Sequence, residues 1–159
     1  MYKNDIMREC VNKAKFTSKC KIGGPFGACI VRNGCVICNT SNSVLKTNDP
    51  TAHAEINAIR TASLILGTYD LSDCELYATG YPCPMCLGAI MWAGIKKVYV
   101  SGLLEDAESI GFIDKQIYET IDKLNKMCYN TNVLELEFHN RELAQDLYKQ
   151  YSENNGTIY

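Results

Sequence analysis

Apolar residues recur along the chain with two different periods, and these periods predict an alternation of helices and strands. Helical spacing of three to four residues covers five stretches, residues 4–18, 52–66, 84–93, 113–126 and 141–151. Short apolar or alternating runs, which are typical of strands, cover residues 28–31, 35–39, 74–79, 97–101 and 133–138. Strands that alternate with helices indicate a sheet covered on both faces. We therefore predict an α/β fold, a three-layer αβα sandwich with a mixed sheet of about five strands.

Glycine residues mark several of the predicted boundaries. Asn33-Gly34 stands between the first two predicted strands and is typical of a hairpin turn, since both residues tolerate a positive φ. Gly67 and Gly94 follow the last residues of two predicted helices, where glycine is a common stop. The sequence thus predicts an opening hairpin, followed by helix crossovers.

Length and composition favour one domain. The chain has 159 residues, of which 47% are apolar, enough for one sizeable core. No internal repeat or linker interrupts it, so residues 1–159 are predicted to form a single domain, with residues 140–159 as a C-terminal helix and tail. The formal net charge is −2, and the densest basic runs are Lys13-Ala14-Lys15 and Lys96-Lys97. We expect a small uncharged substrate rather than nucleic acid.

The N-terminus lacks an apolar signal core, and the longest apolar stretch, residues 89–95, is too short to cross a bilayer. We expect a cytoplasmic protein with no membrane partner. Nine cysteines are present, but a disulfide framework is typical of small secreted chains. Reduced thiols are expected, two of them bound to metal.

Two short segments about thirty residues apart carry the candidate chemistry, Thr51-Ala52-His53-Ala54-Glu55 and Tyr81-Pro82-Cys83-Pro84-Met85-Cys86. A His-x-Glu segment followed by Pro-Cys-x-x-Cys is the signature of zinc deaminases. Zinc takes imidazole and thiolate ligands in a tetrahedron, and a catalytic site leaves one position to water. His53, Cys83 and Cys86 are the predicted ligands of Zn²⁺, and Glu55 is the predicted catalytic acid and base.

The spacing of these residues suits a common pocket. Pro84 is well placed as the first residue of a helix whose opening turn carries Cys83 and Cys86, since residues three apart share a helix face. His53 and Glu55 fall near the start of another predicted helix. Helix N-termini favour thiolates and other anions, so two helix starts directed at one point predict a pocket for a metal and an anionic nucleophile.

Two alternatives concern other cysteine and histidine residues. Cys35 and Cys38 form a second Cys-x-x-Cys, but residues three apart on a strand point to opposite faces, so we expect core packing for this pair. A closed structural zinc site requires a fourth ligand, and the remaining histidine, His139, ends a predicted strand, where a surface or capping role is typical. An open position beside Glu55 favours catalysis.

The predicted site suits hydrolytic deamination. Zinc lowers the pKa of a bound water from 15.7 to about 7 and so supplies hydroxide at neutral pH. A glutamate such as Glu55 then moves the proton to the leaving group, which contributes about 10²–10⁴ in rate. Loss of ammonia from the amidine carbon of a nucleobase fits this chemistry. Zinc peptidases usually have two histidines and a carboxylate as ligands instead.

At these residues the chain resembles the cytidine deaminase-like superfamily, and within it the bacterial guanine deaminases. The resemblance covers most of the chain and rests on residues 23–28, 48–55, 58–60, 83–90, 92–93 and 111–112. It implies a zinc-dependent αβα enzyme that converts guanine to xanthine and ammonia. It also implies a homodimer in which C-terminal segments are exchanged.

The resemblance also implies a set of substrate-binding residues. By position, Asn42 is similar to the base-binding asparagine of the family, and Asp114 to a carboxylate that contacts the base. Phe26 and Trp92 resemble aromatic pocket walls, and Tyr159 a terminal tyrosine that closes the pocket.

One position departs from the family pattern. Members commonly have a glutamate directly before Pro-Cys, where this chain has Tyr81 after Gly80. The alternatives to guanine are therefore guanosine, an aminotriazine, cytosine and tRNA adenosine. A non-catalytic zinc-binding module is the alternative from another class of protein.

Overall fold

Helices and strands alternate along the computed structural model, which describes residues 3–158. The chain separates into two units, one up to Lys115 and the other from Gln116 onward. The first unit holds α1 (Lys3–Lys19), β1 (Gly27–Arg32), β2 (Cys35–Ser41), α2 (Val44–Thr47), α3 (Ala54–Leu66), β3 (Cys74–Ala78), α4 (Pro84–Trp92), β4 (Lys97–Val100) and α5 (Leu104–Glu108). Two further helices are α6 (Lys115–Asn125) and α7 (Arg141–Glu153). The predicted helices and the first four predicted strands are confirmed, whereas α2 and α5 were missed because four or five residues are too few to show a period.

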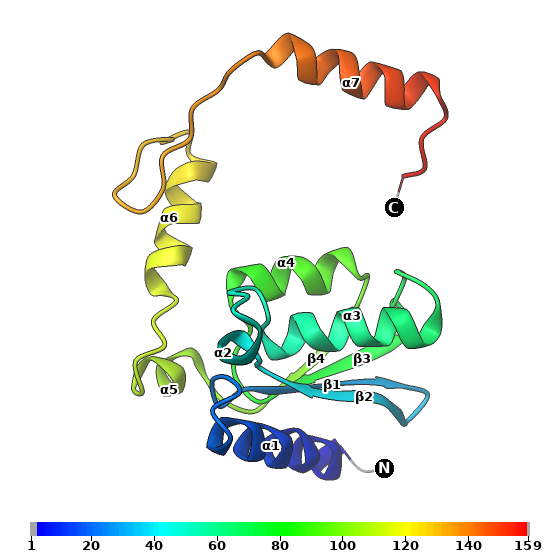
Figure 1. Ribbon diagram of the computed structural model, residues 1–159, viewed down its shortest axis with the longest axis vertical. Helices are drawn as coiled ribbons and strands as arrows, with labels where there is room; N and C mark the ends of the chain where they lie inside the picture. Colours follow the sequence, from blue (N-terminus) through cyan, green and yellow to red (C-terminus); the bar gives the residue numbers. More distant parts are fainter. Residues whose placement is uncertain (1–2, 159) are drawn as a thin grey trace. The chain divides into compact units, whose positions relative to one another are not determined.

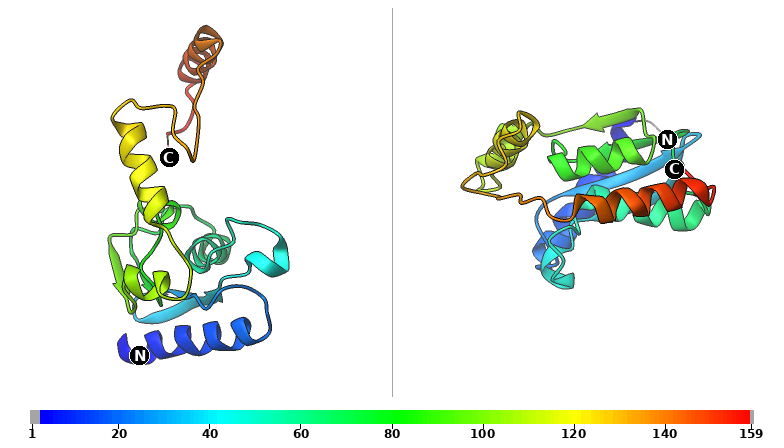
Figure 2. Two further views of the ribbon diagram at one scale, coloured as in Figure 1. Left: turned by 90° about the vertical axis from the view of Figure 1, so that its left-hand side faces the viewer. Right: turned by 90° about the horizontal axis from the view of Figure 1, so that it is seen from above.

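The first unit has three layers, as the sequence predicts. Its sheet has the strand order β2-β1-β3-β4. β1 is antiparallel to β2 and β3, and β3 is parallel to β4, so the sheet is mixed. Helix α1 covers one face, and α3 and α4 cover the other (Figures 1 and 2). The four-stranded sheet corrects the expectation of about five strands.

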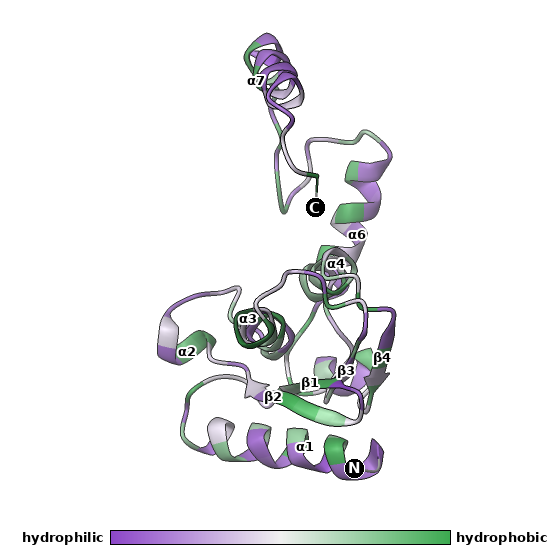
Figure 3. Cartoon of the chain, turned by 90° about the vertical axis from the view of Figure 1, so that its right-hand side faces the viewer, coloured by the Kyte–Doolittle hydropathy of each residue, from purple (hydrophilic) through white to green (hydrophobic). Residues whose placement is uncertain are grey.

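The central strand β1 shows why the sheet needs both helical layers. Ala28 and Ile30 point into a core shared with α3 and α4, while Cys29 and Val31 point into a second core shared with α1. All four are buried because successive side chains of a strand alternate between the two faces. An unbroken apolar run therefore marks an interior strand, and Figure 3 shows hydrophobic residues in the sheet between the helical layers.

The predicted turns and helix ends are present. Asn33 and Gly34 have φ values of 51° and 74° and join β1 to β2, as the Asn-Gly signal predicts. Gly67, with φ 67°, ends α3 in the left-handed conformation. Gly94, with φ 73°, follows the last residues of α4. Local chemistry determines these positions.

The structure corrects two expectations about cysteine. Cys10 of α1 and Cys29 of β1 form a disulfide between buried residues, so the expectation of reduced thiols throughout is wrong for this pair. Cys38 lies in the core as predicted, but Cys35 is exposed at the first position of β2, directly after the Asn33-Gly34 turn, where it pairs with Arg32. Core packing is therefore wrong for Cys35.

The second unit differs from its predicted form at one point. Residues 133–138 were predicted to form a strand, but within the described chain this stretch has only an isolated bridge between Asn130 and Glu135. Leu134 and Leu136 are 47% and 40% exposed. The alternation is present without a partner strand, and a strand needs a neighbour to satisfy its backbone groups. No helix in residues 3–158 has the length and apolar character required to span a membrane.

Candidate active site

The start of α3 carries His53 and Glu55. A loop in which Asp49 accepts hydrogen bonds from the backbone N–H and the hydroxyl of Thr51, at 2.8 and 2.7 Å, leads into this helix. His53 is the N-terminal capping residue, but its side chain makes no capping hydrogen bond, so the imidazole is free to face α4. Glu55 lies in the first turn and is 7% exposed. The positive end of the helix dipole favours an acidic side chain at this position.

The start of α4 carries both cysteines. Cys83 is the capping residue and Pro84 the first helical residue, where proline fits because the N–H it lacks has no partner within the helix. Cys86 lies three residues after Cys83 and thus on the same side of the helix. Both thiols are buried. The predicted helix start is confirmed, with Cys83 directly before the first turn rather than inside it.

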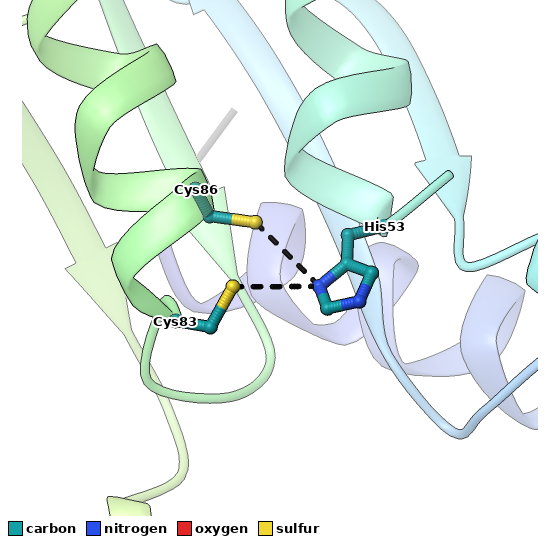
Figure 4. Close-up of side chains that lie close together, drawn as sticks. All are labelled: His53, Cys83 and Cys86. Atoms are coloured by element: carbon teal, nitrogen blue, oxygen red, sulfur yellow. Dashed lines mark hydrogen bonds between the residues drawn. The ribbon is translucent and has the colours of Figure 1, made fainter. Parts of the chain in front are cut away.

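The three side chains converge between α3 and α4 (Figure 4). His53 Nδ1 lies 3.6 Å from Cys83 Sγ and 3.7 Å from Cys86 Sγ. All three ligand atoms lie within 4.8 Å of one another. In a tetrahedral zinc site with ordinary bond lengths, an imidazole nitrogen and a thiolate sulfur are about 3.6 Å apart. The donor set and its spacing therefore fit Zn²⁺ with three protein ligands.

The ionisation of the three side chains is coupled. The hydrogen bond from the Cys86 thiol, assisted by His53, lowers the pKa of Cys83 to about 4. The same pairing with Cys83, together with burial, raises the pKa of Cys86. The contact with Cys83 raises the pKa of His53, and burial opposes that change. A thiolate is the form of cysteine that binds metal, and the site stabilises one at Cys83.

Glu55 and Asp114 face a small cavity of about 40 Å³ beside the metal ligands. His53, Cys83 and Tyr81 also line it. Burial is the main cause that raises the pKa of both carboxyl groups, and for Asp114 the charge of Cys83 adds to it. A carboxyl group whose pKa is raised in this way is suited to proton transfer near neutral pH.

A larger cavity of about 450 Å³ adjoins the first, and His53, Phe26 and Phe112 line both. The rings of Phe26 and Phe112 meet edge to face, with centroids 4.9 Å apart and an interplanar angle of 87°. Such apolar walls suit a flat aromatic ligand.

Asn42 lines the larger cavity and is 4% exposed. Its Oδ1 accepts hydrogen bonds from the backbone N–H groups of Gly24 and Val44, at 3.2 and 3.1 Å. Gly23 makes this approach possible, because a Cβ at that position would lie 2.2 Å from Asn42 Oδ1. Nδ2 of Asn42 makes no hydrogen bond within the described part of the chain. This N–H₂ group is what Asn42 can offer to a ligand.

The predicted site residues divide into three groups. The structure brings together His53, Cys83, Cys86 and Glu55, and it places Asn42, Phe26 and Asp114 in the adjoining cavities. Trp92 instead ends α4, is 76% exposed and is absent from the lining of both cavities. Tyr159 lies outside the described residues.

Sequence reasoning assigned no role to Phe112, which lines both cavities. The feature of the sequence that could have indicated Phe112 is the Gly111-Phe112 pair, since Gly111 has φ 94° and allows a sharp turn after α5.

His139 is exposed, and its Nε2 lies 3.0 Å from Oε2 of Glu137, as expected for a surface residue. Within residues 3–158, the metal-ligand group at His53 is the one found.

The sequence profile described as the cytidine and deoxycytidylate deaminase zinc-binding region matches residues 2–102. The chain belongs to this family. The matched region contains both segments of the zinc motif. Zinc is therefore the metal of this site, and the three-layer sandwich is the cytidine deaminase-like fold.

Among individual relatives, guanine deaminase of Bacillus subtilis is 55% identical over 102 residues. This alignment covers 64% of the present chain and 65% of the relative, just under two thirds of its length. A crystal structure of guanine deaminase from Bacillus subtilis superposes with a TM-score of 0.84 and 40% identity, covering 100% of this chain and 98% of that chain. A tRNA-specific adenosine deaminase of Aquifex aeolicus is 48% identical over 79 residues, covering 50% of this chain and 52% of the relative.

Proposed function

We propose that this protein hydrolyses guanine to xanthine and ammonia. The observation that carries the proposal is a buried glutamate beside three zinc ligands, in a chain whose whole length superposes on a guanine deaminase. The adenosine deaminase relative matches half of the chain. The formal net charge of −2 also favours a small base over tRNA.

The proposed mechanism assigns one role to each polar group. His53, Cys83 and Cys86 hold zinc, which supplies hydroxide at neutral pH because it lowers the pKa of water to about 7. Glu55 takes the proton that the attacking water loses and delivers it to the leaving amino group. A C–O bond forms at C2 of the base and the C–N bond breaks, so that water and guanine become xanthine and ammonia. The raised pKa of Glu55 helps it to hold this proton between the two steps.

The base is held by the walls of the two cavities. Phe26 and Phe112 provide apolar surface for its faces. Asn42 donates from Nδ2 to an acceptor on the ring, and Asp114 accepts from a ring N–H. Glu55 and Asp114 both line the small cavity, so the leaving amino group of the base points into this cavity, where Glu55 can protonate it.

Ammonia release by the zinc-loaded protein tests the reaction. Guanine, guanosine, adenosine, cytosine and the aminotriazine ammeline would be compared under one set of conditions. We expect guanine to have the highest kcat/KM, because the whole chain superposes on a guanine deaminase. Activity confined to another substrate would contradict the guanine assignment. Activity on none of them, together with zinc binding, would favour a non-catalytic zinc module.

A tRNA substrate is the second candidate, and the 48% identity over 79 residues to the tRNA-specific adenosine deaminase of Aquifex aeolicus favours it. Filter binding with tRNA separates the two candidates. The guanine proposal predicts no retention of tRNA at physiological salt, because counterion release from phosphates needs a basic surface.

We further propose that the protein acts as a homodimer with exchanged C-terminal segments, in the cytoplasm. The second unit supports this, because α7 has no buried residue and exposes Leu143, Leu147 and Tyr148 by 63%, 61% and 69%. Apolar surface of this extent marks an interaction site. Apart from the Cys10–Cys29 disulfide, the cysteines are free, Cys83 and Cys86 among them, and this majority of seven suits a reducing compartment.

Light scattering after size-exclusion chromatography measures the assembly. The full chain is expected to elute at twice its mass of 17.8 kDa. Deleting residues 140–159 is expected to give a monomer. A full chain that elutes as a monomer at micromolar concentration would contradict the dimer.

A further inference from the structure

Tyr81 lies at the small cavity, directly before the segment that binds zinc. It lines this cavity together with Glu55, Asp114, Cys83 and His53. Pro82 restricts the backbone between Tyr81 and Cys83, and Cys83 is held as a metal ligand. The position of Tyr81 relative to the reacting end of the cavity is therefore constrained.

The hydroxyl of Tyr81 makes no hydrogen bond to any residue in the range 3–158. The side chain is 46% exposed. By contrast, the hydroxyl of Tyr77 donates to Glu75, and that of Tyr151 donates to the carbonyl of Thr157. An uncommitted phenol beside a catalytic carboxyl group is available to a ligand.

The other polar groups that line this cavity are poorly suited to donate a hydrogen bond to the base. Asp114 accepts hydrogen bonds when ionised, and the proton of Glu55 is used in the reaction. His53 and Cys83 are committed to the metal. A keto oxygen or unprotonated ring nitrogen on the base requires a donor, and the O–H of Tyr81 is the neutral donor at this end of the site.

Gly80 supports the same arrangement. A Cβ at position 80 would lie 3.2 Å from two atoms of the Phe26 ring, closer than most real contacts of this kind. The absence of a side chain at Gly80 thus lets the Phe26 ring pack against the backbone that leads into Tyr81. Phe26 and Tyr81 therefore line the same cavity. Both contribute an aromatic ring, and Tyr81 also contributes a hydroxyl group that can donate a hydrogen bond.

We propose that Tyr81 is a specificity-determining residue that donates a hydrogen bond to an acceptor on the edge of the base. The preferred substrates are then amino-substituted bases that also carry a keto oxygen, such as guanine. This inference rests on the proposed function and adds the group that selects among bases.

Tyr81→Phe removes only the hydroxyl, so it isolates this contact from ring packing. The two test bases are guanine and 2,6-diaminopurine, which has an amino group in place of the keto oxygen. A neutral hydrogen bond is worth about 0.5–1.5 kcal/mol, or about twofold to twelvefold in affinity. We expect kcat/KM for guanine to fall by that factor and kcat/KM for 2,6-diaminopurine to change less than about twofold.

Binding of the same bases is measured by calorimetry in the zinc-loaded Glu55→Gln background, where turnover is absent. Tyr69→Phe is the matched control, because Tyr69 follows α3 and lines neither cavity. An equal effect of Tyr81→Phe on both bases, or no effect on guanine, overturns the role of Tyr81. If guanine binds but is not turned over by the native protein, the proposed function fails alone. If guanine does not bind at all, both proposals fail.

Discussion

Glu55→Gln is expected to lower kcat for ammonia release by about 10²–10⁴-fold while the zinc content stays unchanged. Glutamine has the same shape but cannot take a proton from water and return it to the leaving amino group. Glu55 is not one of the three ligand residues, so the metal should remain. Steady-state ammonia release and elemental analysis of the purified protein measure the two quantities.

The matched control for this prediction is Glu9→Gln, since Glu9 is exposed on α1, on the other face of the sheet. It should change kcat by less than about twofold, as is usual for a surface substitution. If Glu55→Gln kept kcat within threefold of the native value, Glu55 could not be the proton shuttle. If zinc were lost as well, the substitution would have disturbed the ligands, and the kcat comparison would then be made at restored zinc content.

Cys86→Ser is expected to weaken zinc binding by at least about 100-fold and to abolish measurable turnover. Disturbing groups that merely support a metal ligand already costs about 10–100-fold in affinity, and Cys86 is a predicted ligand itself. Its sulfur lies 3.7 Å from His53 Nδ1 in a fully buried position, so the serine hydroxyl would be a weaker and shorter donor in the same place. A competition titration with a chromophoric chelator measures the affinity.

Cys38→Ser is the control for general damage to the core. Cys38 is also buried, and its thiol donates to the carbonyl of Ala58 at 3.3 Å, a contact that serine can keep. This variant should retain zinc and most of the activity. Equal zinc loss in both variants would point to core disruption, and full zinc retention in Cys86→Ser would remove Cys86 from the ligand set.

Local features of this protein could be predicted from sequence because their causes are local. The Asn33-Gly34 turn, the helix stop at Gly67 and the helix start at Pro84 each depend on the conformational limits of one or two residues. The same holds for the continuous apolar run of β1, which indicates burial on both faces. The predicted zinc ligands could be found in the sequence for a related reason, because Cys83 and Cys86 share one short segment and His53 lies at the start of another.

The substrate cavities were harder to predict from the sequence, because their walls come from segments that lie far apart in the chain. Phe26 precedes β1 and Phe112 follows α5, and only folding brings their rings to 4.9 Å. The resemblance placed Trp92 in the pocket, yet the residue ends α4 and is 76% exposed in this chain. Neither the type of a residue nor its position at a helix end determines whether its side chain faces a cavity or the solvent.

By itself, the sequence determined the longer helices and the four strands of the sheet, the three-layer arrangement and the three residues predicted to bind zinc, since each depends on periodicity or on a short motif. The tertiary structure decided which alternating runs become strands. Residues 133–138 alternate as well as residues 97–101 do, but only the latter lie beside β3 and satisfy their backbone hydrogen bonds there. It also decided that the Tyr81 hydroxyl stands uncommitted beside Glu55, because that depends on which side chains surround it after folding.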